Sequence, residues 1–513
     1  MYTHRYRGRL EDAVVDAKSA ATIALNRFGL GARPDQPVPD NPKAWLLDQF
    51  ARFEAKPAAI AAVPGRTEVA AQLADYLVRL RPFLRQQAQA GPRAMAQVAP
   101  PAMAPEMQGG AAKPAEAPDP VRDARRFAGQ QGRNNYVTQV GARATTALLT
   151  DTPFVERLVH FWANHFAVSA DKLTVVGLSG LLEFEAIRPH VLGRFGDMLN
   201  AVERHPAMLL YLDQAASIGP DSMLATRAAR FAPKRKLGLN ENLAREILEL
   251  HTLGVRTGYS QADVTEFARA LTGWTVTGLA NGPLARAIGA DGTPGDFVFA
   301  DAIHQPGERS IMGRRYAQQG VAQGQAVLND LAVHPATATH IATKLARHFA
   351  GDTPPPAMVQ RLEAAFLRSG GDLPSVYRAL VDSREAWVAA PVKFRTPWEW
   401  GMAAVRATGA RQLPAANVAG LMTQLGQPVW RPGSPAGWDD LSGSWAGPDA
   451  VMRRVEAAQR MAARVAELVD ARALAPKLFP AAVSEQTSRV LANADSGQQA
   501  LALLLVAPEM MRR

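Results

Sequence analysis

The chain reads Asn240-Glu-Asn-Leu-Ala-Arg-Glu-Ile-Leu-Glu-Leu-His-Thr-Leu-Gly254 in the stretch that decides its fold, and this stretch has the outline of an amphipathic helix. Asn240 can cap the first turn, and Gly254 suits the position just after a helix end. Apolar residues recur at helical spacing from Leu243 to Leu250, which indicates one side that faces a core. The stretch therefore predicts a helix that packs on a larger helical body.

Another side of this predicted helix carries an unusual amount of charge. Asn242, Glu246 and Glu249 fall at positions i, i+4 and i+7, so their side chains share a face. Arg245 is placed to pair with Glu241 or with Glu249. Charge in such an ordered pattern makes this face a candidate functional surface.

A second helix is predicted directly after the short turn at 256–259. Ser260 and Asp263 match a capping box, and apolar residues follow at helical spacing. Asp263, Glu266 and Arg269 are spaced three apart along another stripe. The two helices, residues 240–274, would form a hairpin whose acidic faces could converge.

Two interpretations of this helix pair stay open. The first is a carboxylate–histidine site for a divalent metal ion, because helix-borne Glu and His build such sites in helical bundles. Its candidate metal ligands are Glu246, Glu249, His251, His165 and His304. The candidate catalytic residues are Glu246, Glu249, His251, Arg245, Asp263, Glu266 and Arg269.

Geometry opposes one part of the metal interpretation. Glu249 and His251 are two positions apart and point about 200° apart on an ideal helix. They could share an ion only if the helix ends or distorts there. The second interpretation is a buried Arg–Glu–Asp network that fixes how the two helices cross.

Helical spacing also dominates the rest of the chain, so the predicted fold is mainly α. We expect one large multi-helical domain, with residues 1–88 as its N-terminal helical segment and residues 121–513 as its main body. Residues 89–120 are rich in Ala, Pro and Met and predict a flexible, disordered linker or insertion. Residues 297–303 and 309–312, around Pro306-Gly307, predict one small β-hairpin.

Composition narrows the classes of function. The chain has 513 residues, a formal charge of +10 and no cysteine, which excludes disulfides, thiolate nucleophiles and cysteine-held metals. The positive charge is spread along the chain without interleaved aromatic residues, so we expect no nucleic-acid partner. No apolar run is long enough to span a membrane. No secretory signal is visible, which favours the cytoplasm; export to the periplasm together with a partner is the alternative.

Five tryptophans cluster late in the sequence, and two interpretations fit them. They could line a groove for sugar rings or a polymer, or they could belong to a packed, proline-rich cap. The five are Trp398, Trp400, Trp430, Trp438 and Trp445.

Several segments resemble the bacterial family called domain of unknown function 1800. They include Phe161-Trp-Ala-Asn-His-Phe166, the helix pair through Thr272-Gly-Trp274, His304-Gln-Pro-Gly-Glu308, Lys344-Leu345, Leu425-Gly-Gln427 and Gly437-Trp438. The resemblance extends over nearly the whole chain from about Ala24, apart from the linker. Ala163 stands where members often have the first of two histidines, which weakens any two-histidine site.

This resemblance implies no reaction, because the activity of the family is not established. Genes of the family commonly neighbour those of a second one, domain of unknown function 1501, which is similar to sulfatases and alkaline phosphatases. The first functional hypothesis is a metal-dependent enzyme, hydrolytic or oxidative, that acts at the helix pair. The rival is a non-catalytic partner or assembly factor for a sulfatase-like protein of the cell envelope.

Overall fold

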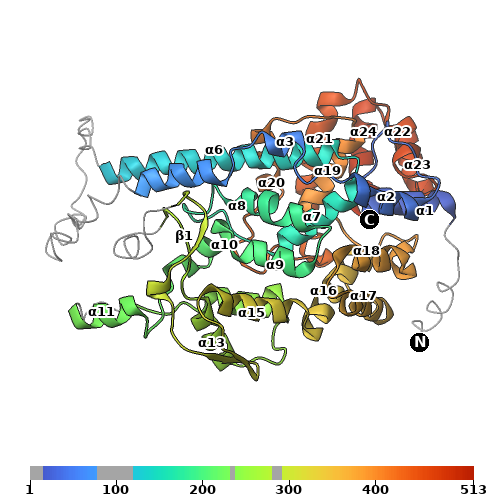
Figure 1. Cartoon of the computed structure of the whole chain (residues 1–513). Coiled ribbons are helices and arrows are strands. Elements are labelled where there is room, and N and C mark those ends of the chain that lie inside the picture. Colours follow the sequence, from blue (N-terminus) through green and yellow to red (C-terminus); the bar gives the residue numbers. More distant parts are fainter. Residues whose placement is uncertain (1–15, 78–119, 232–236, 280–291) are drawn as a thin grey trace, which may run out of the picture.

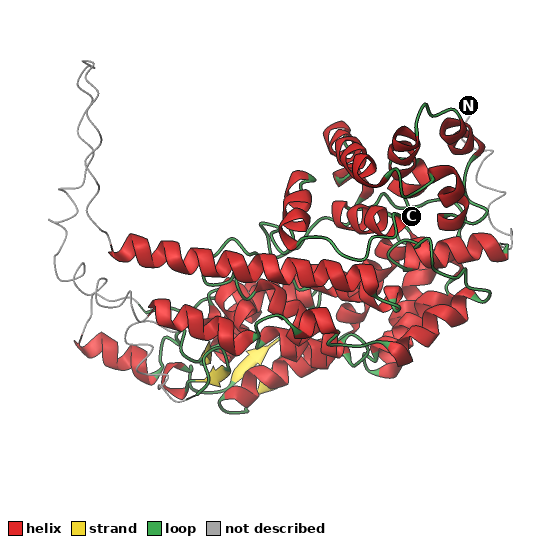
Figure 2. Cartoon of the chain, turned by 90° about the horizontal axis from the view of Figure 1, so that it is seen from above, coloured by secondary structure: helices red, strands yellow, loops and turns green. Residues whose placement is uncertain are grey.

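A computed structural model describes residues 16–77, 120–231, 237–279 and 292–513. Helices make up most of this part of the chain, which confirms the prediction of a mainly α fold (Figures 1 and 2). Residues 89–119 of the predicted linker lie outside the described residues. Buried apolar side chains from Ile23 to Met511 belong to one continuous core cluster.

The longer helices form the framework of this core. They are α2 (Pro42–Arg52), α6 (Pro120–Leu149), α7 (Pro153–His165), α9 (Phe195–Glu203), α11 (Met223–Phe231), α13 (Gln261–Leu271), α15 (Val321–Ala332), α16 (Pro335–Ala350), α17 (Pro356–Ser369), α18 (Leu373–Asp382), α19 (Pro397–Ala407), α20 (Ala415–Gln424), α21 (Pro448–Val465), α22 (Ala471–Leu478), α23 (Glu485–Ala492) and α24 (Gly497–Leu505). Short helices connect them: α1 (Ala17–Ile23), α3 (Ala58–Ala61), α8 (Ser179–Leu181), α10 (Pro206–Tyr211), α12 (Asn242–Glu246) and α25 (Pro508–Met511).

Helix α7 lies near the middle of the fold, between α6 and the lower helices of Figure 1. The long helix α6 runs across the top of Figure 1 and packs against α19 and α20. At the right of Figure 1, the C-terminal helices α22 and α23 lie next to the N-terminal α1, where Thr22 donates to the Pro480 carbonyl. Below them, α16 packs on α17, and α15 contacts both α9 and α13. Helix α7 is buried along most of its length, so its side chains meet residues from distant parts of the chain.

The strands pair differently from the predicted hairpin. Strand β2 (Phe297–Phe299) pairs with β1 (Trp274–Val276), and β3 (Arg309–Ile311) pairs with β4 (Arg314–Tyr316), both antiparallel. The turn between β3 and β4 places Met312 and Gly313 at positive φ, as a two-residue hairpin turn requires. The predicted pairing of 297–303 with 309–312 was therefore wrong, because Met312-Gly313 makes the turn that we had assigned to Pro306-Gly307.

The predicted helix pair is present, but its first helix changes form. Helix α12 ends at Glu246 and continues as a wider π-helical turn, η6 (Ile247–His251). Helix α13 begins with the predicted capping box between Ser260 and Asp263. Gly254 adopts a φ of +95°, and a side chain there would approach His340 to 3.0 Å. The π-helical turn matters because it decides where His251 points.

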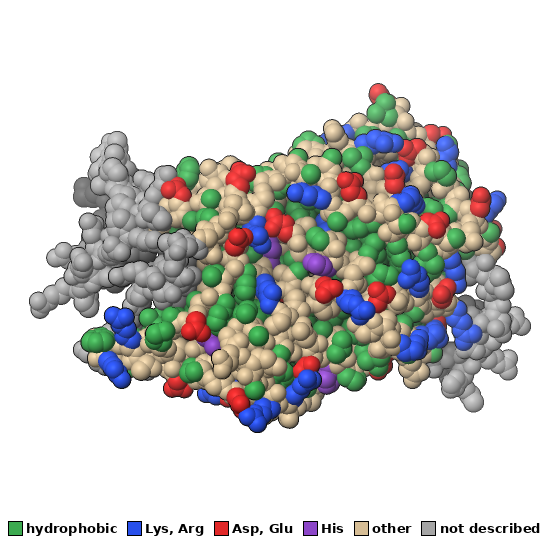
Figure 3. Space-filling model, viewed as in Figure 1, with side chains coloured by type: hydrophobic (Ala, Val, Ile, Leu, Met, Phe, Trp, Pro, Cys, Tyr) green, Lys and Arg blue, Asp and Glu red, His purple; other side chains and the backbone are tan. Residues whose placement is uncertain are grey.

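Charged groups of both signs are interspersed on the molecular face drawn in Figure 3. Across the described ranges, no helix combines the length and the hydropathy that crossing a lipid bilayer requires.

Candidate functional site

The charged face of α12 and η6 forms a ladder of ion pairs. Arg245 lies between Glu241 and Glu249, with N–O distances of 3.2 and 3.5 Å. All three side chains are partly exposed to solvent. Burial raises the pKa of the Glu246 carboxyl, and the negative charge of Glu249 also raises it. Such exposed pairs at i, i+4 contribute little to stability and leave no cation free for a substrate.

The charged residues of α13 also have structural partners. Asp263 closes the capping box through Oδ2, and its Oδ1 accepts a hydrogen bond from the Met312 amide at 2.6 Å. Glu266 pairs with Arg269 and with Arg309. These contacts tie α13 to the β3–β4 hairpin, while the uncharged Gln261 and Thr265 of α13 donate to Glu241 beside α12.

His251 is buried behind the helix pair because of the π-helical turn. Its Nδ1 donates to Glu203 Oε1 at 2.7 Å, and both side chains are fully buried. The backbone carbonyl of His251 accepts a hydrogen bond from His165 Nε2 at 3.1 Å. The helix thus distorts where a shared metal site would need it to, but His251 turns toward Glu203 while Glu249 pairs with Arg245.

The five predicted metal ligands come together only in part. The His165 and His251 rings lie 6.3 Å apart, whereas His304 donates to the Thr272 carbonyl at 2.8 Å in another part of the fold. Among the described residues, no group of three or more His, Asp or Glu side chains could hold a metal ion. Metal binding at the helix pair stays a prediction.

His165 faces a cavity that sequence reasoning did not predict. This cavity has a volume of about 110 Å³ and is lined by residues of α6, α7, α16, α19 and the loop 427–440. Part of its wall is formed by three tryptophans, which are Trp398, Trp430 and Trp438. We therefore call it the tryptophan-lined cavity. Several segments that carry the family resemblance meet here, including 161–166, 344–345 and 437–438.

The tryptophan cluster of the sequence therefore divides between a cavity wall and the core. Trp400 is fully buried and donates to the Leu505 carbonyl, as expected for a packed cap. Trp445 packs against Trp438 with a ring-centroid distance of 5.9 Å and supports the wall from outside. Three of the five tryptophans thus line a cavity and two pack behind it, while binding of sugar rings or a polymer stays a prediction.

Arg143 fixes the other two tryptophans of the wall. Its guanidinium lies 4.4 Å from the ring centroid of Trp398 and 5.4 Å from that of Trp430. Glu183 accepts from Arg143 Nε and, at 2.9 Å, from Trp430 Nε1. Trp430 has a φ of +50°, which is costly for a bulky residue and persists only where the surroundings enforce it. The wall is thus held in place before any ligand binds.

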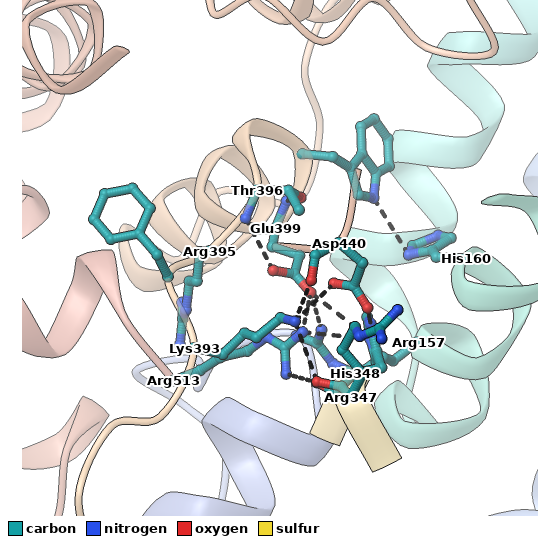
Figure 4. Close-up of polar contacts among 12 residues, drawn as sticks. Arg157, His160, Arg347, His348, Lys393, Arg395, Thr396, Glu399, Asp440 and Arg513 are labelled. Atoms are coloured by element: carbon teal, nitrogen blue, oxygen red, sulfur yellow. Dashed lines mark hydrogen bonds and ion pairs between the residues drawn. The ribbon is translucent and has the colours of Figure 1, made fainter. Parts of the chain in front are cut away.

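A buried ion-pair network closes the cavity on the side of α19. Glu399 contacts Arg157, Arg513 Nη2 at 2.8 Å and His348 Nε2 at 3.9 Å (Figure 4). His348 Nδ1 lies 3.1 Å from Asp440. Burial alone would raise the pKa of the Glu399 carboxyl, but the surrounding cations hold it well below its usual range. Glu399 is therefore ionised and saturated with cations, which suits support rather than catalysis.

Lys344 is different, because it reaches the cavity and no carboxylate of the described residues lies at hydrogen-bond distance from its amine. Its Nζ lies 2.9 Å from His165 Nδ1. The pKa of Lys344 is lowered to about 8, mainly by burial; the charge of Asp440 opposes this lowering and the charge of Arg347 adds to it. Burial and the charge of Lys344 hold the pKa of His165 well below its usual range.

Comparison with known families identifies the family of this chain. Residues 23–512 match the family described as a protein of unknown function (DUF1800). The chain belongs to this family. Comparison with curated proteins and with solved structures gave no match. Membership in DUF1800 confirms the resemblance seen in the sequence and brings no activity or partner with it, so the expected sulfatase-like partner stays a prediction.

Sequence reasoning named His165 and the tryptophans of this DUF1800 cavity without bringing them together, and it gave Lys344 no role, although Lys344 left a signal. Lys344 follows Ile341 by three positions, at the edge of the apolar face of α16. A lysine on such a face is unusual and marks a buried or paired amine. Glu203, Glu399 and Arg513 left no such signal, because their partners lie far away in the sequence.

The buried histidines predict a loss of stability in mild acid. Burial lowers the pKa of His205 to about 3 and that of His340 to about 4. Between these values and about 6.5, only the unfolded chain takes up the protons, so unfolding becomes easier as the pH falls. Each histidine should cost about 1.4 kcal/mol per pH unit in this window. Urea unfolding at pH 7, 6 and 5 measures the effect.

A variant at His205 separates the contribution of this histidine to the pH dependence of stability from that of the other histidines. His205 Nδ1 caps α10 by accepting from the Ala207 amide, and asparagine can cap in the same way without titrating. We expect His205→Asn to reduce the slope of stability against pH between pH 6 and 4. Equal slopes in the two proteins would show that His205 does not stay neutral in the fold.

Proposed function

We propose that this protein is an enzyme whose active site is the tryptophan-lined cavity and whose general base is the amine of Lys344. The observation that carries the proposal is the contact between Lys344 Nζ and His165 Nδ1 at the cavity wall. The reaction class is abstraction of a proton, either from the substrate or from a water molecule that attacks it. A hydrolytic reaction fits this class.

The environment of Lys344 suits a base. A lysine with a pKa of about 8 is neutral in a substantial fraction of molecules near pH 7.5, and enzymes that use lysine as a base tune it to this range. Lys393, by contrast, is held by Asp352 at 3.1 Å and by Asp440 at 3.4 Å. Of these two lysines of the region, Lys344 is the one whose amine is available to a ligand.

His165 would act as a positioning residue. A carbonyl oxygen can only accept a hydrogen bond, so the contact with the His251 carbonyl fixes the proton of His165 on Nε2. The Nδ1 lone pair then accepts from Lys344 and aims the amine. The His251 carbonyl is in turn fixed by the π-helical turn and the contact of His251 with Glu203. The helix pair would thus contribute to the site from behind the cavity.

The walls indicate the kind of substrate. The cavity is small, and rigid indole faces favour a flat or ring-shaped surface with apolar character. Asn164 and Gln427 also line it, but the Asn164 amide is engaged with Trp438 and Gln427 Oε1 with the Trp398 amide. A compact ring-containing molecule with one group that loses a proton fits this arrangement.

Competitive labelling with trace acetic anhydride tests the proposal directly. The acetylation of each lysine, followed by mass spectrometry as the pH rises, reports the pKa of its amine. We expect an apparent pKa of about 8 for Lys344. The half-exposed Lys43 serves as the control for the reactivity of a solvent-accessible amine. An apparent pKa of Lys344 at the ordinary lysine value of about 10.4 would overturn the proposal.

A substrate screen provides the functional test. For any ring-containing ester, amide or glycoside that the protein hydrolyses, Lys344→Met should lower kcat/KM by about 100-fold or more. Lys43→Met is the matched control and should leave the rate unchanged. Unaltered turnover in Lys344→Met would remove Lys344 from the reaction even if its pKa is low.

A further inference from the structure

A second cavity lies in the seam between two helix layers. Helix α20 packs on α6 and α19, whereas α21 packs on α24. The space between α20 and α21 forms a groove of about 360 Å³, which falls in the range of about 300 to 1,000 Å³ usual for ligand sites. We call it the α20–α21 groove, and it shares no lining residue with the tryptophan-lined cavity.

The walls of the groove are mainly apolar. Leu413, Leu421, Met461 and Val465 pack against the core and are only partly buried. Their exposed surface gains free energy when an apolar chain covers it. The groove thus has the character of a site for an alkyl chain.

The charge of the groove has a single sign. Arg460 and Arg464 are the only charged side chains among its described lining residues. Arg464 makes no hydrogen bond or ion pair with any described residue, and Arg460 approaches Glu456 only at 4.0 Å with both side chains half exposed. Two arginines four positions apart on one helix repel each other, and an anion between them would relieve that repulsion.

A glycine keeps the groove open. Gly420 lies inside α20, where glycine is the least favourable residue after proline. Its backbone does not need positive φ, and a Cβ atom there would meet no atom of the described residues within 4 Å. Neither the backbone nor close packing of the fold therefore explains glycine at this position. What it provides is free space in the groove.

We propose that the α20–α21 groove binds a fatty carboxylate, with the alkyl chain along the apolar wall and the carboxylate between Arg460 and Arg464. The apolar lining, the two cations of one sign and the space above Gly420 carry this assignment together. The proposal is independent of the function proposed for Lys344.

Calorimetric titration with monomeric dodecanoate tests the assignment, and two substitutions at one position provide a matched pair. Gly420→Phe fills the groove, whereas Gly420→Ala adds one methyl group and leaves most of it open. Both should fold at least as well as the parent, because both residues favour a helix more than glycine does. We expect Gly420→Phe to weaken dodecanoate binding at least tenfold and Gly420→Ala to change it less than threefold.

A second experiment tests whether the ligand must carry a negative charge. Dodecyltrimethylammonium has the same alkyl chain and the opposite charge, so it should bind at least tenfold more weakly than dodecanoate. The double variant Arg460→Gln with Arg464→Gln should abolish that preference. Absence of dodecanoate binding, or equal binding by both Gly420 variants, would overturn the proposal. So would a concentration-dependent dimer that Gly420→Phe disrupts without any effect of dodecanoate.

Discussion

Replacement of Glu399 by glutamine should destabilise the protein by about 3–5 kcal/mol, because it leaves buried cations without their counter-charge. The side chains of Arg157 and Arg513 are 3% and 0% exposed, and both depend on the Glu399 carboxylate. Glutamine preserves the size of the side chain and its role in the capping box with Thr396, so the variant removes little besides the charge. Urea unfolding followed by circular dichroism measures the loss.

The helix pair provides the control for this prediction. Glu249 also faces an arginine, Arg245, but at 3.5 Å and with 26% and 35% of the two side chains exposed. Glu249→Gln should therefore cost less than about 0.5 kcal/mol. A similar cost for Glu249→Gln and Glu399→Gln would mean that water reaches the Glu399 network and screens it.

The contrast between these two glutamates explains what sequence reasoning could find. The helix at 261–271 and its capping box were predicted correctly because spacing and caps are local signals. The same locality drew attention to Glu246 and Glu249, since their pattern along one helix is visible in the sequence. Such a pattern cannot distinguish a solvated ladder of ion pairs from a site, because both need charges on one face.

The cavity itself was hidden for the opposite reason. Lys344 and His165 come from α16 and α7, and their contact joins positions 179 apart. No spacing rule encodes such a contact. The π-helical turn was equally invisible, because an ideal 3.6-residue period was assumed for the stretch that ends at His251. The predicted pairing of β2 was wrong for a similar reason. Its partner strand, Trp274–Val276, comes before it in the chain, directly after α13, and not after the next turn.

Gly437→Ala should remove one wall of the tryptophan-lined cavity. Gly437 has a φ of +79°, and a Cβ atom there would lie 2.2 Å from the Asn164 carbonyl oxygen, far inside contact distance. Asn164 also holds Trp438 through two hydrogen bonds, of 2.7 and 2.8 Å. The added methyl group must therefore push Trp438 away from α7.

Gly433→Ala is the matched control, because it separates the cost of the backbone from the cost of the clash. Gly433 has a similar φ of +73°, but a Cβ atom there would meet none of the atoms that the structure describes within 4 Å. Gly433→Ala should cost about 1–2 kcal/mol from the positive φ alone. Gly437→Ala should cost about 1–3 kcal/mol more, as overpacking does in a closed site.

The same pair of variants connects the wall to the proposed chemistry. Burial is the main cause of the low pKa of Lys344, so water admitted by a displaced Trp438 should raise that pKa toward the ordinary value for lysine. Competitive labelling should therefore give a Lys344 pKa above about 8 in Gly437→Ala and a pKa of about 8 in Gly433→Ala. If Gly437→Ala is destabilised but Lys344 does not shift, the Trp438 wall supports the fold without keeping water from the amine, and another part of the cavity must lower its pKa.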